Sequence, residues 1–110
     1  MTPLEIFKKI KKTLAEHPEK VAGLTATYDF TVTNTGGDDF TFHLQFEDGK
    51  PPVAEQGLLG DAKVAYTVAA EFAEAALAKT SKDAQMMFMT GKLKMKGDMG
   101  LAMKLVKIMD

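Results

Sequence analysis

The stretch LTATYDFTVTNTGGDDFTFHLQFE, residues 24–47, contains the pattern that decides the fold. Apolar and polar side chains alternate in it on both sides of a turn that contains Gly36 and Gly37. This alternation is typical of a strand with one buried and one solvent-exposed face. Two such runs joined by a short glycine-containing turn predict an antiparallel hairpin.

Three further stretches predict strands that extend this hairpin into a sheet. A weak strand is expected near Val53, at a sheet edge, because Pro51 and Pro52 precede it and proline cannot donate a ladder hydrogen bond. Residues 62–68 alternate again, and residues 93–95 show the same pattern between lysines. The sequence therefore predicts a sheet of five strands.

Four stretches show helical spacing of their apolar residues instead. Thr2 and Glu5 form a capping box around Pro3, which begins a helix that is expected to end at Glu16, before Pro18. Three more helices are expected: one over residues 69–79, a shorter one that carries residues 86–89, and one that follows Asp98 and runs to Met109.

The order of these elements predicts the fold class. Ser81 or Asp83 can cap the second of the later helices, and Asp98 the third. Because the alternating strands leave only one dry sheet face, the helices must gather on that face. The other face, rich in threonine and lysine, is expected to be exposed to solvent. The expected class is α+β, with a five-stranded, mainly antiparallel sheet and helices packed on one face.

Length and composition predict one domain over residues 1–110. Hydrophobic residues make up 45% of the chain and charged residues 26%, and the formal charge is −1. These values are ordinary for a globular protein, and this length allows one sizeable core. No apolar run approaches the roughly 18 residues of a membrane span, and the N-terminus lacks the apolar segment of a secretion signal. We therefore expect a cytoplasmic protein.

Residue types that are absent or rare disfavour several kinds of site. Without cysteine there is no thiol nucleophile or thiolate metal site. All 14 basic residues are lysine, so the arginine fork that dominates phosphate and guanine recognition is missing, which disfavours a nucleic-acid partner. The single serine, Ser81, and the two histidines, His17 and His43, suggest no nucleophile–base pair. We expect no catalytic residue.

Two local motifs have an alternative functional interpretation. Residues 97–100 match the GxxG loop that binds RNA in KH domains, but an aspartate inside that loop would repel phosphate. Asp38, Asp39 and His43 could hold a metal ion, although hard cations need more oxygen ligands than these. We therefore expect neither a metal ion nor a cofactor.

The last expected helix is apolar around most of its circumference, whereas a surface helix normally has one apolar stripe. Seven of the eight methionines lie between Met86 and Met109. Flexible thioethers suit an apolar surface that adapts to different ligands, and they define a unique core poorly. Two interpretations stay open from these residues alone: a helix wedged between sheet and neighbouring helix, or a helix that also walls a ligand cavity.

Residues 91–105, GKLKMKGDMGLAMKL, resemble the C-terminal signature of the sterol carrier protein type 2 family. Asp61, Val64 and Phe72 occupy places similar to those of the family's fourth strand and following helix. The resemblance implies an apolar tunnel between the sheet and its helices. It also implies binding of sterols, fatty acids, acyl-CoA or phospholipid without chemistry. The final residues, KIMD, lack the targeting tripeptide of the peroxisomal members.

Helical spacing then divides the last helix into two sides. Leu101, Leu105 and Ile108 are expected to pack on the sheet, and the side with Met103 is expected to face the ligand. The full set of expected ligand-binding residues is Phe72, Ala76, Met86, Met89, Leu93, Met95, Met99, Met103 and Val106.

The function predicted from these residues and this resemblance is that of a non-enzymatic lipid-binding and lipid-transfer protein. Two alternatives stay open: an accessory domain that presents lipid to a partner enzyme, and an enzyme that acts on acyl substrates. Lys92, Lys94 and Lys96 share one face of the fifth expected strand, where they could give transient contact with an anionic membrane surface.

Overall fold

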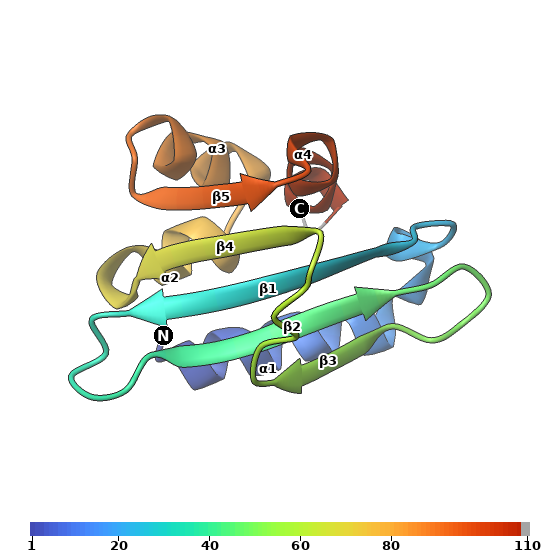
Figure 1. Cartoon of the computed structure of the whole chain (residues 1–110), viewed down its shortest axis with the longest axis horizontal. Coiled ribbons are helices and arrows are strands. Elements are labelled where there is room, and N and C mark those ends of the chain that lie inside the picture. The colour runs from blue at the N-terminus through green and yellow to red at the C-terminus, as the bar shows by residue number, and fades with distance from the viewer. Residues whose placement is uncertain (109–110) are drawn as a thin grey trace.

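The computed structural model describes residues 1–108, in which a five-stranded sheet carries helices on one face (Figure 1). The strands are β1 (Ala26–Thr33), β2 (Phe40–Phe46), β3 (Val53–Gln56), β4 (Val64–Ala69) and β5 (Leu93–Gly97). The helices are α1 (Pro3–Glu16), the 3-10 helix η1 (Pro18–Val21), α2 (Ala70–Leu77), α3 (Ser81–Met89) and α4 (Met99–Ile108). The expected α+β class is confirmed. Met109, the expected last residue of the final helix, lies outside the described residues.

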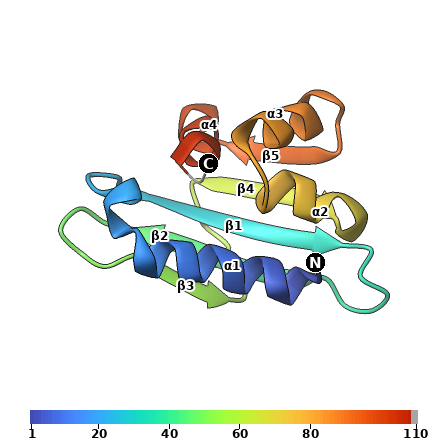
Figure 2. The ribbon, with the colours of Figure 1, turned by 180° about the vertical axis from the view of Figure 1, so that it is seen from behind.

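The strand order is β3-β2-β1-β4-β5, with the proline-preceded β3 at an edge as its sequence predicts. β1 pairs antiparallel with β2 and parallel with β4, so that Phe30 lies opposite both Phe42 and Tyr66. The β2–β3 and β4–β5 pairs are antiparallel. Figure 2 shows α1 on the β1–β2 side of the inner face, and α2, α3 and α4 toward β4 and β5.

β4 follows β3 in the chain but lies beyond β2 and β1 in the sheet, where it pairs parallel with β1. The chain must therefore cross over the sheet between β3 and β4. Residues 57–63 form this connection and cross in front of β1 on the outer face (Figure 1). Asp29 on β1 receives hydrogen bonds from the backbone N–H of Leu59 at 2.8 Å and of Gly60 at 2.9 Å. Asp29 is therefore buried, which corrects the expectation that the whole outer face is open to solvent.

The helix starts follow the local sequence with one correction. Thr2 and Glu5 form the expected capping box of α1. At α3, however, the N-cap is Thr80 instead of Ser81 or Asp83, because the Asp83 side chain completes a capping box with Thr80. The fourth strand begins at Val64, two residues later than expected from its alternation.

The corner between β5 and α4 depends on a glycine and an aspartate. Gly97 has φ +98°, and a Cβ atom there would lie 2.1 Å from the Lys63 carbonyl oxygen. The Asp98 backbone N–H then bonds to that same carbonyl at 3.0 Å. The Asp98 side chain accepts a hydrogen bond from the N–H of Leu101 at 3.0 Å, as the cap of α4 requires. This corner fixes the start of α4 beside the start of β4.

We predict that Asp29→Asn lowers the free energy of unfolding by about 2–4 kcal/mol, because an amide replaces a carboxylate that accepts two backbone hydrogen bonds. One of the two N–H groups would then face another donor. Urea unfolding measures the change. Asp39→Asn is the matched control, because Asp39 is exposed in the hairpin turn and its change should stay within about 0.5 kcal/mol. Equal losses in both variants would contradict the role of Asp29.

Candidate functional site

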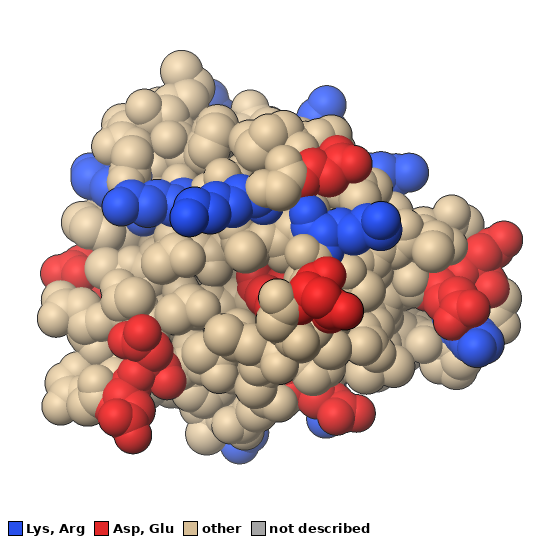
Figure 3. Space-filling model, viewed as in Figure 1, with Lys and Arg blue, Asp and Glu red and all other residues tan. Residues whose placement is uncertain are grey.

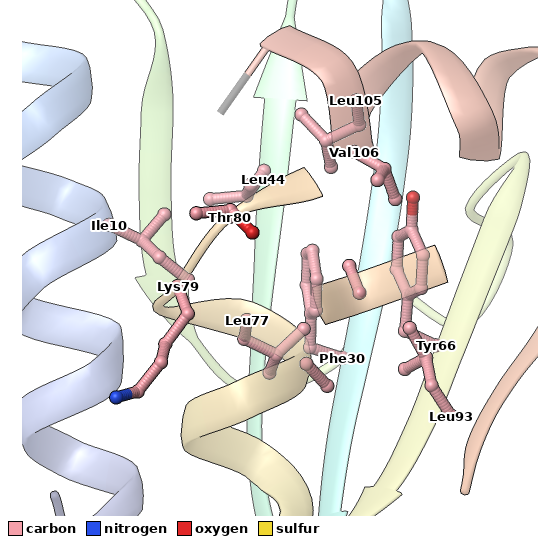
Figure 4. A pocket seen from close by; sticks show the side chains of 12 residues that line it. Ile10, Phe30, Leu44, Tyr66, Leu77, Lys79, Thr80, Leu93, Leu105 and Val106 are labelled. Atoms are coloured by element: carbon pink, nitrogen blue, oxygen red, sulfur yellow. The ribbon is translucent and has the colours of Figure 1, made fainter. Parts of the chain in front are cut away.

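A cavity lies between the inner sheet face and the helices, and every layer of the fold contributes to its lining (Figure 4). The sheet supplies its floor, α1 and α2 supply one side, and α3 and α4 close it. The lining residues are Ile10, Phe30, Leu44, Tyr66, Ala76, Leu77, Lys79, Thr80, Ala84, Leu93, Leu105 and Val106. An apolar cavity at the centre of the molecule is the candidate site.

The floor of the cavity belongs to a row of aromatic rings that runs across three neighbouring strands. Phe30 stacks on Phe42 with ring centroids 4.5 Å apart, and on Tyr66 with centroids 4.8 Å apart. The strand register places these three rings directly opposite one another. Because stacked rings on hydrogen-bonded strands have few alternative rotamers, this side of the cavity is rigid.

The first turn of α4 is attached to the sheet by two tyrosine hydroxyls. The Tyr28 hydroxyl donates to the Leu101 carbonyl at 2.9 Å, and the Tyr66 hydroxyl to the Ala102 carbonyl at 2.7 Å. Burial, with a smaller effect of the Asp98 charge, raises the pKa of Tyr28 from 10.0 to about 12. Burial also raises the pKa of Tyr66, and the neighbouring Tyr28 adds to this. Both hydroxyls therefore stay protonated donors over the physiological pH range.

The cavity is small in this structure. Its volume is about 40 Å³, which is room for about two or three water molecules, whereas pockets for organic ligands measure about 300–1,000 Å³. A small, partly open cavity lies where the apolar tunnel is expected. An acyl chain can enter only if part of the wall moves.

The cover formed by α3 and α4 is held less firmly than α1. Within the described residues, α3 buries one side chain, Ala84, and α4 buries Ala102 and Leu105. By contrast α1 buries four apolar side chains against the sheet. Elements with few buried contacts open at a lower free-energy cost than the rest of a fold. Movement of α3 and α4 is therefore an easier way to enlarge the cavity than movement of α1.

A polar opening adjoins the cavity where α2 leads into α3. Lys79 and Thr80 line the cavity and also a neighbouring hollow of about 300 Å³, to which Lys9 and Thr13 contribute. The Lys79 ammonium group points away from the apolar side chains (Figure 4) and lies 3.6 Å from a Glu74 carboxylate oxygen. Lys9 donates to the Ala78 carbonyl at 2.6 Å. Two ammonium groups thus flank this opening.

The structure brings together three of the residues expected to bind ligand. Ala76, Leu93 and Val106 line the cavity. Phe72 and Met95 are half-buried and pack against the core. Met103 is half-buried and lies outside the cavity lining, whereas its neighbour Leu105 lies inside it. The remaining three, Met86, Met89 and Met99, have exposed fractions of 52%, 80% and 39%. Contact of any of these nine residues with lipid stays a prediction.

On the sheet side of the cavity, sequence reasoning named only Leu93 and missed the other three lining residues. Phe30, Leu44 and Tyr66 fall on the inward positions of alternating strands, and that alternation was the available signal. The methionine clustering directed attention to the C-terminal third instead. Ile10 and Leu77 come from helices whose inward faces were predicted, but helical spacing alone does not show which inward residues border empty space.

Other possible sites are less suitable for an apolar ligand. A larger open hollow of about 800 Å³ lies between the end of α1, η1 and the β2–β3 turn, but five charged side chains contribute to its lining. In residues 1–108 no three His, Cys, Asp or Glu side chains are grouped to hold a metal ion. The His43 Nδ1 lies 2.9 Å from the Gly57 carbonyl in the crossover. No helix in this part of the chain is long and apolar enough to cross a bilayer.

Comparison with known proteins gives a consistent result. The profile of the SCP-2 sterol transfer family matches residues 7–110. The solution structure of palmitated SCP2L2 from Aedes aegypti has 21% identity and a TM-score of 0.77, covering 96% of this chain and 92% of that one. The sterol carrier protein domain 2 of Helicoverpa armigera has 25% identity and a TM-score of 0.61, covering 86% and 74%.

A third similar structure is UbiJ-SCP2, described as a ubiquinone synthesis protein, with 14% identity and a TM-score of 0.69, covering 98% of this chain and 95% of that one. A search of curated protein sequences gave no match.

The two tyrosines give a prediction about pH. Because their folded-state pKa values are raised, the stability that they contribute is complete below pH 10.0, the ordinary tyrosine value, and is lost as the pH rises toward about 12. While circular dichroism shows the protein folded, tyrosinate absorbance should therefore appear well above pH 10.0, the ordinary tyrosine value. The chain has two tyrosines and no tryptophan, so Tyr28→Phe and Tyr66→Phe each leave one reporter. Tyrosinate formation near pH 10 in a folded protein would contradict this.

Proposed function

The chain belongs to the SCP-2 sterol transfer family, and from that premise we propose that it holds an apolar lipid in the cavity over the Phe30 and Tyr66 rings. It transfers the lipid between sites without altering it chemically. The observation that carries the proposal is the cavity itself, which has apolar walls from the sheet and from all four α-helices. The cavity lies between the packed aromatic rings of the sheet and the cover formed by α3 and α4. This position suits a ligand that must be enclosed and released.

Burial of the lipid supplies the binding energy. A sixteen-carbon acyl chain gains roughly 12 kcal/mol in apolar transfer, at about 0.8 kcal/mol for each methylene. Association and ordering losses, together with the displacement of α3 and α4, reduce this to an affinity in the micromolar to nanomolar range. Selectivity for chain length should be poor, because one methylene more or less changes little in an apolar pocket.

The opening beside the cavity favours an anionic lipid. The ammonium groups of Lys9 and Lys79 flank it, so a carboxylate or phosphate head group could remain there in contact with water while the chain is buried. The solved structure of palmitated SCP2L2, whose fold this chain shares, supports a fatty acid as the first ligand to test. Acyl-CoA, sterols and phospholipids complete the proposed ligand class, and we place the protein in the cytoplasm.

A second candidate function is presentation of the lipid to a partner enzyme. The similarity to UbiJ-SCP2, described as a ubiquinone synthesis protein, favours this candidate because it covers almost the whole of both chains. The candidate differs from diffusive transfer in requiring a stable protein partner. Affinity purification of the tagged chain from its host under native conditions separates the two, since a diffusing carrier should be recovered with lipid and without a stoichiometric enzyme.

We predict that Val106→Glu abolishes binding of a fluorescent fatty acid to delipidated protein. Val106 lines the cavity at a half-buried position, so the new carboxylate would have to be desolvated against the bound chain. Unfolding temperature should fall only modestly, because the charge can reach water when the cavity is empty. Displacement by unlabelled palmitate checks that the probe occupies the lipid site.

Lys104→Glu is the matched control, because it introduces the same carboxylate on an exposed position of α4. It should bind like the unchanged protein. Met103→Glu in the same assay tests whether the site extends beyond the cavity to the methionine side of α4. Normal binding by Val106→Glu, or equal loss by Lys104→Glu, would refute the cavity as the lipid site.

A further inference from the structure

The carboxylate of Glu74, on α2, lies between two cations beside the opening of the cavity. Its Oε1 accepts a hydrogen bond from the Met1 amino group, and its Oε2 lies 3.6 Å from the Lys79 ammonium group. The bond from the Met1 amino group is the main cause that lowers the pKa of Glu74, and the Lys79 charge adds to it. Glu74 is therefore a negative charge throughout the physiological pH range.

The two lysines at this opening have different partners. Lys9 reaches from α1 and donates to the neutral Ala78 carbonyl at 2.6 Å, whereas Lys79 faces the charged Glu74. Lys79 lines both the cavity and the hollow beside it, and Lys9 lines only the hollow. The lysine that borders the cavity is thus the one whose charge is paired with a carboxylate.

A further group of lysines lies on the opposite face of the sheet. Lys94 and Lys96 are exposed on β5 and point in the direction opposite to the buried Leu93. Figure 3 shows a line of positive charge over this strand. The sheet lies between this charge and the opening, and exposed charges more than about 10 Å apart are largely screened by salt. The charge that a ligand meets at the opening therefore depends on Glu74 and the two lysines beside it.

An anionic head group at this opening would meet Glu74 as a competitor, because Glu74 already pairs with the lysine that borders the cavity. The Lys79 and Glu74 side chains have exposed fractions of 54% and 37%, and ion pairs this open to solvent contribute little to stability. The flexible lysine side chain can exchange one carboxylate for another by rotating about its own bonds. After such an exchange Glu74 keeps its bond from the Met1 amino group.

We propose that Glu74 is a specificity-determining residue, which pairs with Lys79 in the empty protein and releases it to the carboxylate of an incoming fatty acid. Glu74 thereby lowers the affinity for a fatty acid, and it leaves the affinity for an uncharged lipid of the same length unchanged. This role rests on the proposed function, because it requires a lipid in the cavity. By limiting how tightly an anionic lipid is held, Glu74 favours its release.

A purely structural role of Glu74 would have a different signature. The ion pair would then only stabilise the end of α2, and its removal would change the binding of charged and uncharged lipids equally. Both side chains are partly exposed, so their replacement should leave the fold intact, which circular dichroism checks.

Competition between a charged and an uncharged ligand of equal length tests the inference. Dodecanoate and dodecanol each displace a pyrene-labelled alcohol from delipidated protein at neutral pH. Glu74→Gln should raise the affinity for dodecanoate about threefold, the size expected for an exposed ion pair, and leave the affinity for dodecanol unchanged. Lys79→Gln should lower the affinity for dodecanoate by a similar factor. When Lys79→Gln is already present, Glu74→Gln should have no further effect, because Glu74 acts by competing for Lys79.

Glu71→Gln is the matched control. It removes the same charge from an exposed position of α2, and Glu71 lies outside the linings of the cavity and the hollow. Its affinities should equal those of the unchanged protein. An equal gain in Glu71→Gln, or an equal gain for dodecanol in Glu74→Gln, would overturn the inference. A gain that persists without Lys79 would also overturn it and would assign the effect to the Met1 amino group.

The same measurements separate a failure of the proposed function from a failure of this role. If the unchanged protein binds both ligands and Glu74→Gln changes neither affinity, only the role of Glu74 is refuted. If the unchanged protein binds neither ligand, the proposed function is refuted and the role of Glu74 with it.

Discussion

Two hydrogen bonds connect the sheet of this protein to the helix α4 that covers the cavity. Tyr28 and Tyr66 stand in the buried face of the sheet and donate to carbonyls in the first turn of α4. Their rings belong to the packed aromatic surface of the sheet, while their hydroxyls set the height of the helix above it. The cavity lies beneath this helix, so its volume depends on these contacts. Neutral hydroxyl–carbonyl bonds contribute only about 0.5–1.5 kcal/mol each, which is strong enough to position α4 and weak enough to release it.

The size of the cavity means that a lipid could enter it only if the cover moved. At about 40 Å³ it excludes an acyl chain, and a permanently enlarged apolar cavity would destabilise the fold by about 24 cal/mol for each cubic ångström. A protein that spends time without ligand is therefore more stable with the cavity closed. The small residues Ala76 and Ala84 line it, and α3 and α4 bury few side chains, so enlargement disrupts little packing. The exposed methionines on the same cover are consistent with contact outside the chain.

Much of the fold could be predicted from local patterns, because alternation and capping act over a few residues. The hairpin, the edge position near Val53 and the Thr2 cap all follow from such patterns and are confirmed. The crossover was missed because Asp29 occupies an outward position that normally faces water, and only the tertiary path of residues 57–63 covers it. The site was harder to predict than the fold because the positions of its residues also depend on tertiary structure. Helical spacing shows that Met89 and Leu105 are apolar positions but not that one faces solvent and the other the cavity.

The central claim is that lipid enters the cavity under α3 and α4 by displacing that cover. Amide hydrogen exchange, compared between palmitate-loaded and delipidated protein, tests it most directly. We predict that the largest changes in protection fall in α3, α4 and the end of α2, with little change at the β2–β3 turn. The claim would be contradicted if the largest changes fell instead around Leu14, Val21 and Pro51, which line the larger open hollow.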